Sequence, residues 1–427
     1  MAAVNAAIAW IRPEILSLPD AVLEKAIADP QLHPFRRKLQ ISLRDKPHTL
    51  DQEQEALLAQ ASEPLNTPVQ AFSLLNNADL RFPEVHDENG EKVQLTHGNF
   101  IRFLESPQRE VRREAFESLF GSYRDFRNTF AALLGGHVRK QIFLSRARKF
   151  PSALAASLHP DNIPQRVYET LIEVVHENLP VLQQYLELRR QVLKLPELEY
   201  YDLYVPMVPS LDLEIPYEQA QEWVLAAVEP LGEEYVTVCR NAFAERWIDV
   251  WETPGKRSGA YSSGCYDSPP YILMNYQNNL NSVFTLAHEL GHSLHSWFSR
   301  QAQPHHYAQY KIFVAEVAST VNEALLSHYL LNTSTNNRIK AYLLNQKCEA
   351  FRTTVFRQTM FAEYEKLIHE QAENGQPLTA DTLCETYRQL TQRYYAPGVR
   401  QHPLIEMEWA RIPHFYYNFY VYKYATG

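Results

Sequence analysis

The stretch Leu286-Ala287-His288-Glu289-Leu290-Gly291-His292 places two histidines four residues apart, with a glutamate directly after the first of them. In a helix of about 3.6 residues per turn, side chains at this spacing lie on one face, so both imidazoles can reach the same ion. Two histidines and a carboxylate in this order are typical of the metal ligands and general base of a zinc hydrolase. A helix with two solvated histidines is the alternative that the motif alone leaves open.

The residues around this motif predict a long helix. Apolar residues recur at helical spacing and would face a core: Val283, Phe284, Ala287, Leu290, Leu294, Trp297 and Phe298. We expect Asn281 or Ser282 to cap its start, and Pro304 to end it no later than Ala302. Gly291 in mid-helix costs about 1 kcal/mol relative to alanine. Something is therefore expected to approach the backbone closely there, and a metal with bound substrate would meet that need.

A second helix is predicted from Ile312 to Leu331, apolar nearly all round except for one polar stripe. Glu316 and Glu323 lie two turns apart on this stripe. A buried carboxylate must be paired or bind a cation, because its isolated burial is costly. A turn between the two helices would bring one glutamate to the metal as a third ligand. Chemistry does not choose between them, and a bond to an arginine or tyrosine elsewhere in the core is the alternative for each.

Two stretches before the motif are predicted to be short strands. Ser258–Ser262 and Pro270–Tyr276 contain aromatic or β-branched residues and are bounded by glycine and proline. An ordinary hairpin that covers the core accounts equally well for this pattern.

The end of the chain, Arg411–Tyr424, is rich in aromatic residues. His414, Tyr417, Tyr420 and Tyr424 share approximately one helical face. Such a stripe more often belongs to a core than to a catalytic site. A hydrolase that cleaves an amide must, however, stabilise an oxyanion, and neutral tyrosine or histidine donors suit that task.

Together these features resemble the thimet oligopeptidase and oligoendopeptidase F group of zinc metallopeptidases, and the oligoendopeptidase F branch most closely. Three blocks in the same order carry the resemblance: Ala287–Ser296, Phe313–Thr320 followed by Asn322-Glu323, and Arg411–Tyr417. Three ordered blocks are far more specific than a single motif.

The resemblance implies roles for the residues of the first two blocks. One zinc ion per chain would be held by three ligands, with a general base beside it and a carboxylate that orients a ligand histidine: His288, His292 and Glu316, then Glu289 and Glu323. His295 has no ligand role in this family and is expected to be a polar residue of the same helix face.

The resemblance also implies how substrate is held. Family members pair an extended peptide backbone with the edge of a strand next to the metal, which is β-augmentation. In this chain the residues expected to take part are Gly259, Tyr261, Tyr271 and Asn275.

A histidine and nearby tyrosines stabilise the oxyanion in the family. His414 matches the histidine directly. The spacing after it is shorter than in the thimet branch, so we expect Tyr417 and Tyr420, in preference to Tyr422, to be the tyrosines.

The composition favours a helix-rich protein without nucleic acid or membrane partners. The chain has 427 residues, only 13 glycines, and a net charge of -9 with no basic block. Its cysteines are scattered, as expected for reduced thiols in a cytoplasmic protein: Cys239, Cys265, Cys348 and Cys384. The start does not resemble a signal peptide, and no window offers the roughly 20 apolar residues of a membrane helix. We expect a cytoplasmic location.

We expect a mainly α fold, a zincin-like helical metallopeptidase with a small β-sheet next to the zinc helix and an N-terminal helical lobe. Helical spacing predicts the lobe over 1–195, and a stretch interrupted by prolines follows it. Residues 196–427 would form the catalytic zinc-peptidase domain. Relatives start earlier and continue further, so this chain is expected to be the middle of a longer protein that lacks parts of both ends.

The expected function is that of a zinc-dependent endopeptidase, an oligopeptidase that hydrolyses internal bonds of short unstructured peptides with metal-activated water. A carboxypeptidase or aminopeptidase could use the same metal site and would add a pocket for a free terminus. A helical peptide-binding protein that retains zinc without turnover is the other alternative. The presence of Glu289 argues against it.

Overall fold

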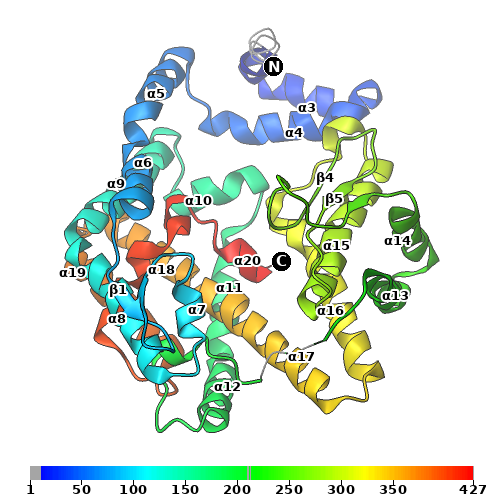
Figure 1. Ribbon diagram of the computed structural model, residues 1–427. Helices are drawn as coiled ribbons and strands as arrows, with labels where there is room; N and C mark the ends of the chain where they lie inside the picture. The colour runs from blue at the N-terminus through cyan, green and yellow to red at the C-terminus, as the bar shows by residue number, and fades with distance from the viewer. Residues whose placement is uncertain (1–10, 209–210, 212, 427) are drawn as a thin grey trace.

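The computed structural model describes residues 11–208, 211 and 213–426. It is mainly helical and has two small β-sheets, so the predicted fold class is confirmed. Figure 1 shows two groups of elements side by side, one blue to cyan with an orange-red end and the other green to yellow. Within the described ranges, no helix combines the length and apolar character needed to cross a membrane.

The first group is formed by helices from both ends of the sequence. Its core joins apolar side chains of residues 72–203 with those of residues 356–422. Its helices are α6 (Thr67–Leu74), α7 (Phe100–Leu104), α8 (Arg109–Asp125), α9 (Arg127–Ala147), α10 (Ala153–Leu158), α11 (Gln165–Glu177), α12 (Leu179–Val192), α18 (Arg357–Glu373), α19 (Ala380–Tyr395) and α20 (Tyr422–Thr426).

The second group has a separate core, made by residues 215–343. Its helices are α13 (Tyr217–Val228), α14 (Glu233–Ala244), α15 (Leu280–Ala302), α16 (Ala315–Thr333) and α17 (Asn337–Ala350). The chain returns to the first group after residue 356, so the C-terminal helices pack with the N-terminal ones. The division into domains 1–195 and 196–427 stays a prediction.

Four helices precede the first core: α2 (Ile11–Ser17), α3 (Asp20–Ala28), α4 (Arg36–Asp45) and α5 (Gln52–Leu65). Figure 1 shows α3 and α4 along the top of both groups. Residues 34–38, which lead into α4, contact the connection that follows α15. The Lys38 N–H donates to the Tyr307 hydroxyl at 3.1 Å, and His306 Nε2 lies 2.7 Å from the Pro34 carbonyl oxygen. This segment therefore links the two groups.

Short 3-10 and π-helical segments connect the longer helices. The 3-10 segments are η1 (Pro30–Phe35), η2 (Lys46–His48), η4 (His159–Asp161), η5 (Tyr200–Asp202), η6 (Glu229–Leu231), η7 (His305–Tyr307), η8 (Ile312–Val314), η10 (Pro403–Arg411) and η11 (Pro413–Tyr416); the π-helical ones are η3 (Leu75–Asp79) and η9 (Phe351–Phe356). The helix predicted from Ile312 to Leu331 starts as the 3-10 segment η8. It becomes α-helical only at Ala315, three residues later than predicted.

The N-terminal lobe also contains a β-hairpin, which its helical spacing did not predict. Strands β1 (Glu84–His86) and β2 (Lys92–Gln94) form an antiparallel hairpin in which Val85 pairs with Val93. The turn contains Asn89-Gly90, with Gly90 at a φ of 78°. Asparagine followed by glycine between apolar strand residues is a strong hairpin signal, which the helical spacing on either side obscured.

The sheet beside the motif helix has three strands in the order β3-β5-β4. Strands β4 (Tyr261–Ser263) and β5 (Tyr271–Leu273) are antiparallel and coincide with the two predicted stretches, β4 running one residue further. The two-residue β3 (Ile248–Asp249), parallel to β5, was not predicted because so short a run has no periodic pattern. The β4 strand is left at an edge of the sheet.

Helix α15 begins slightly earlier than expected. Asn279 has an extended backbone, and its side chain accepts a hydrogen bond from Ser282 N–H at 2.9 Å. The predicted caps, Asn281 and Ser282, are therefore already inside the first turn. The other end falls at Ala302, as predicted, because Gln303 is extended and Pro304 follows it.

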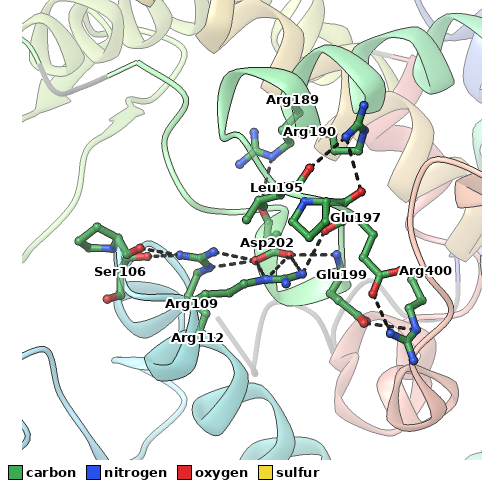
Figure 2. A network of polar contacts seen from close by, with 12 residues as sticks. Ser106, Arg109, Arg112, Arg189, Arg190, Leu195, Glu197, Glu199, Asp202 and Arg400 are labelled. Atoms are coloured by element: carbon green, nitrogen blue, oxygen red, sulfur yellow. Dashed lines mark hydrogen bonds and ion pairs between the residues drawn. The ribbon is translucent and has the colours of Figure 1, made fainter.

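A buried ionic network fixes the proline-containing segment to α8. Figure 2 shows Asp202 of η5 between Arg109 and Arg112, whose Nη2 atoms lie 2.8 and 2.7 Å from its two carboxylate oxygens. The Glu199 N–H donates to the same carboxylate at 3.0 Å, and Arg112 also donates to the Ser106 carbonyl at 2.7 Å. Asp202 is fully buried, so these partners replace all of its hydration.

Candidate metal centre

Three side chains of α15 and α16 bring their ligand atoms together. The Nε2 atoms of His288 and His292 are 3.1 Å apart, and each is 3.3 Å from Oε2 of Glu316. A tetrahedral zinc ion with bonds of about 2.0–2.1 Å places its ligand atoms roughly 3.3–3.4 Å apart, so this donor set fits three corners of such a site. Across the described part of the chain, no other cluster of three His, Cys, Asp or Glu residues has metal-ligand spacing.

Glu323 approaches the same imidazole from its other side. Its Oε1 lies 2.5 Å from Nδ1 of His288, so Nδ1 carries the proton and Nε2 is directed towards Glu316 and His292. Burial lowers the pKa of His288, but the hydrogen bond and charge of Glu323 outweigh it, and the net shift is upward. Glu323 therefore favours positive charge on this ring, whether from a proton or from a metal at Nε2.

The α16 helix is not the buried helix that its apolar sequence predicted. It packs against α15 and α13, whereas Val317 and Val321 are exposed at 43% and 41%. The side chains of Glu316 and Glu323 are exposed at 41% and 39%. The expectation of deep burial was wrong because the described neighbours of α16 lie on only part of its surface. Both carboxylates are therefore partly hydrated.

Gly291 allows α15 and α16 to approach each other closely. A Cβ atom on Gly291 would lie 2.5 Å from Cα of Ser319 and 2.7 Å from the carbonyl oxygen of Ala318. Near this contact, Asn322 Nδ2 donates to the Ala287 carbonyl at 3.0 Å. The close neighbour predicted at Gly291 is thus the backbone of α16, and not a metal with bound substrate.

Replacing Gly291 by alanine is expected to weaken zinc binding at least about tenfold, because the added methyl group would displace α16 and move Glu316 away from the histidines. Competition with a chromophoric chelator measures this affinity. Gly121→Ala in α8 is the matched control, since a Cβ there meets nothing within 4 Å. Equal zinc affinity in parent and Gly291→Ala would contradict the explanation.

His295, one turn beyond His292, does not join the metal group. Its ring stacks on Tyr310 with 3.6 Å between centroids, and its Nδ1 is buried without a hydrogen-bond partner. Burial lowers the pKa of His295, so the ring is mainly neutral at neutral pH. It lies on the same helix as the candidate ligands but contacts a different part of the structure.

Glu289 is buried beside the metal group and retains one free oxygen. The Ser262 N–H donates to its carboxylate, whereas Oε2 is buried without a hydrogen-bond partner. Ser262 in turn contacts Ser293 through hydroxyl oxygens 2.8 Å apart, which fixes β4 against α15. Burial raises the pKa of Glu289, although the two ligand histidines oppose this. A carboxylate with a raised pKa and a free oxygen is suited to accepting a proton.

The residues expected to bind peptide lie on or beside β4. Tyr261 and Tyr271 are exposed, and Gly259 has a left-handed backbone with a φ of 86°. Asn275 Nδ2 donates to the carbonyl oxygens of Arg257 and Gly259 at 3.0 and 2.9 Å, so its amide nitrogen holds the loop before β4. Binding of peptide by these four residues stays a prediction.

The aromatic segment is not one helix, and the predicted common helical face was wrong. The η11 segment ends at Tyr416, and α20 begins only at Tyr422. Between them, Asn418 and Phe419 have positive φ values of 53° and 55°, which reverse the chain. The side chains converge because the backbone turns back on itself, and not through helical periodicity.

His414 and Tyr424 are brought together by this turn. His414 Nε2 lies 3.1 Å from the Tyr424 hydroxyl, and the Tyr420 ring stacks on His414 with 6.1 Å between centroids. Burial raises the pKa of Tyr424 to about 12, and the charge of Glu316 contributes to the shift. The Tyr424 hydroxyl is therefore within electrostatic reach of the metal group.

The other tyrosines differ in position. Tyr417 is largely exposed and contacts His414 ring to edge, whereas Tyr422 is buried in the first core. The family resemblance led to Tyr417 and Tyr420 as the expected donors, whereas Tyr424 was placed on the same face and not selected. Tyr420 and Tyr424 are four residues apart and their rings are 5.4 Å apart between centroids, so this helical spacing is the signal that could have identified Tyr424.

Two helices of the first group hold the turn. Phe419 N–H donates to Oε1 of Glu365 in α18 at 2.6 Å, and the Ser157 hydroxyl donates to the Asn418 carbonyl at 2.8 Å. Glu365 is fully buried, and its Oε2 has no hydrogen-bond partner. The left-handed residues are thus fixed from both sides.

Stability should fall with rising pH through Glu365. Burial raises the pKa of Glu365 to about 8 from an ordinary value of 4.5. Between these pH values the unfolded chain releases a proton that the folded protein retains, so a rise in pH favours unfolding. Glu365→Gln should therefore gain stability relative to the parent as pH rises from about 5.5 to 7.5, by up to about 1.4 kcal/mol per pH unit.

Urea unfolding of both proteins across this range measures the effect. Glu187→Gln, on the exposed side of α12, is the control and should show a constant difference from the parent. A constant difference for Glu365→Gln as well would mean that this carboxyl does not titrate differently in the folded state.

Comparison with known proteins shows extensive similarity. The family model described as Peptidase family M3 matches residues 102–427, and the one described as Oligopeptidase F matches residues 14–82. Oligopeptidase PepF of Bacillus subtilis is 48% identical over 422 residues, which are 99% of this chain and 63% of the relative. Group B oligopeptidase PepB of Streptococcus agalactiae is 42% identical over 98% of this chain and 70% of the relative. The chain thus spans less than two thirds of the length of the Bacillus protein.

Solved structures agree in fold. A crystal structure of a Chlamydophila abortus protein has a TM-score of 0.95 and 38% identity, covering 99% of this chain and 71% of that one. The crystal structure of oligoendopeptidase-F from Enterococcus faecium has a TM-score of 0.79 and 40% identity, covering 99% and 70%.

Proposed function

Because this chain belongs to peptidase family M3, we propose that it is a zinc-dependent endopeptidase that hydrolyses internal bonds of short, unstructured peptides. The observation that carries the proposal is the spacing of the His288, His292 and Glu316 ligand atoms beside the free buried oxygen of Glu289. The names of the relatives, oligopeptidase and oligoendopeptidase F, support peptides as the substrate class.

His288, His292 and Glu316 would hold one zinc ion, and Glu323 would orient His288 through its Nδ1 proton. Zinc bound in such a site polarises a carbonyl group and lowers the pKa of water to about 7. Glu289 then accepts the proton of the attacking water on its free Oε2 and transfers it to the leaving amine. No covalent bond between enzyme and substrate is required.

Donors on the aromatic segment would stabilise the oxyanion. Burial lowers the pKa of His414, so its ring is neutral at neutral pH and can donate without adding charge. The Tyr424 hydroxyl shares a hydrogen bond with His414 and is influenced by Glu316, which adds it to the predicted pair of Tyr417 and Tyr420. Neutral donors aimed at a developing negative charge are each worth about 3–4 kcal/mol in comparable sites.

The edge of β4 would align the peptide. Its neighbour β5 occupies one side, which leaves the other edge of the described sheet for an extended backbone. The Ser262 N–H donates to Glu289 and so ties this strand directly to the base. Binding through backbone hydrogen bonds depends little on the side chains of the peptide, which suits an enzyme acting on many short peptides.

The test combines metal analysis with cleavage of an internally quenched peptide blocked at both ends. We expect one zinc per chain, cleavage at an internal bond, and loss of cleavage with dipicolinate that zinc restores. Isophthalate, which lacks the chelating nitrogen, is the matched control and should not inhibit.

Other outcomes would select an alternative. Cleavage only of peptides with a free end would indicate a carboxypeptidase or aminopeptidase. Zinc without cleavage of any peptide would favour a helical peptide-binding protein, and a purified chain that cannot bind zinc would contradict the proposal.

A further inference from the structure

Asp161 forms ion pairs with lysines from two distant parts of the chain. Its Oδ2 is 2.8 Å from Nζ of Lys423, and its Oδ1 is 3.4 Å from Nζ of Lys311. Lys311 also donates to the carbonyl oxygen of Pro160 at 2.9 Å. One short segment, η4, therefore holds both lysines at the same point.

The pair between Asp161 and Lys423 is well shielded from water. Their side chains are exposed at only 13% and 16%, whereas Lys311 is exposed at 58%. Burial by itself would raise the pKa of Asp161, but the hydrogen bonds and charges of Lys423 and Lys311 lower it. The carboxylate is thus ionised in the folded protein, and Lys423 is its stronger partner.

The two lysines lie close in sequence to two different parts of the candidate site. Lys311 immediately precedes η8, which runs into α16 and reaches Glu316 five residues later. Lys423 lies in α20 next to Tyr424, whose hydroxyl meets His414. Asp161 therefore forms ion pairs with both segments: the one that leads to the candidate ligand Glu316, and the one that contains the candidate oxyanion donor Tyr424.

Apolar contacts join the same two segments, η8 and α20. Phe313 of η8 is partly buried and packs against the first core, which also includes Tyr422 of α20. Beside the ion pairs, the rings of Phe313 in η8 and Tyr422 in α20 lie 6.0 Å apart between centroids. Figure 1 shows α20 directed from the first group towards α15 and α16.

We propose that Asp161 is a positioning residue whose carboxylate, through Lys311 and Lys423, keeps Glu316 at a fixed distance from the His414 and Tyr424 donors. This inference rests on the proposed peptidase function for its effect on rate. Asp161 is not one of the candidate ligands or donors, so it would act by aligning the His414 and Tyr424 donors with Glu316. A misplacement of about 1 Å in such a site lowers the rate about a hundredfold.

The first experiment compares peptide cleavage by the parent, Asp161→Asn and Lys423→Met. We expect kcat to fall about 10- to 100-fold in each variant, with KM nearly unchanged and zinc content equal to the parent. The double variant should be no slower than the slower single one, because both changes break the same pair. Glu187→Gln, which breaks an exposed pair with Arg190 in α12, should leave kcat unchanged.

Hydrogen exchange provides a readout that does not depend on activity. In Asp161→Asn, amide exchange should rise together at residues 312–316 and 420–426 and remain unchanged in α8 and α9. If the parent cleaves no peptide but exchange rises at both segments, the proposed function fails and the positioning contact stands. Unchanged kcat and exchange in Asp161→Asn and Lys423→Met would overturn the inference.

Two further results would also overturn it. Fully additive losses in the double variant would mean that Asp161 and Lys423 act separately. If Asp161→Asn does not fold, Lys423→Met and Lys311→Met carry the test, and a parental kcat in both would exclude the positioning role.

Discussion

Replacing Glu289 by glutamine is expected to lower kcat/KM for a blocked peptide by about 10²- to 10⁴-fold while zinc content stays equal to that of the parent. Glutamine has nearly the same shape and can still accept the hydrogen bond from Ser262 N–H. It has no carboxylate to receive a proton at the position of the free Oε2. The variant therefore isolates proton transfer from metal binding and from the packing of β4 on α15.

Single-turnover cleavage and metal analysis of the same preparation measure this prediction. Glu187→Gln removes a carboxylate from an exposed site on α12 and should cleave at the parental rate. Loss of zinc together with activity would mean that Glu289 acts on the metal and not as the base. An activity within twofold of the parent would exclude a general-base role.

Removal of the Asp202 carboxylate is expected to have the largest effect on stability. In Asp202→Ala, Arg112 would remain buried with one carbonyl partner from Ser106 and another from Pro107, and Arg109 would lose its charged partner (Figure 2). Breaking a buried ion pair on one side typically costs about 3–5 kcal/mol, because it leaves an uncompensated charge. The segment after α12 should also detach more easily from α8.

Urea unfolding followed by circular dichroism, with calorimetry as a second probe, measures the loss. Glu187→Ala removes the partner of an exposed arginine and should cost no more than about 1 kcal/mol. A loss for Asp202→Ala as small as that of the control would show that water compensates the two arginines. Because the chain has two cores, the midpoints from both probes should be compared before a single free energy is derived.

The fold was predictable wherever one local pattern extended over several turns. The α15 helix ends at the predicted residue, because apolar periodicity and Pro304 are both local signals. Short elements were missed or misjudged: β3 has two residues, and the β1-β2 hairpin is surrounded by helical sequence. The prediction of one helix in the aromatic segment was wrong for a different reason. Two consecutive left-handed residues, Asn418 and Phe419, are held by Glu365 and Ser157, which lie far away in sequence.

The amino-acid sequence is sufficient to predict the class of fold, the motif helix and the residue types needed for a zinc site. Spacing within one helix is a property of adjacent residues, so helical geometry alone puts His288 and His292 on one face with Glu289 beside them. Only the tertiary structure brings Glu316 to both imidazole Nε2 atoms and Glu323 to Nδ1. That choice depends on how α16 sits against α15, which the backbone contact of Gly291 with Ser319 fixes. Contacts between separate elements depend on packing, which no periodicity within either element encodes.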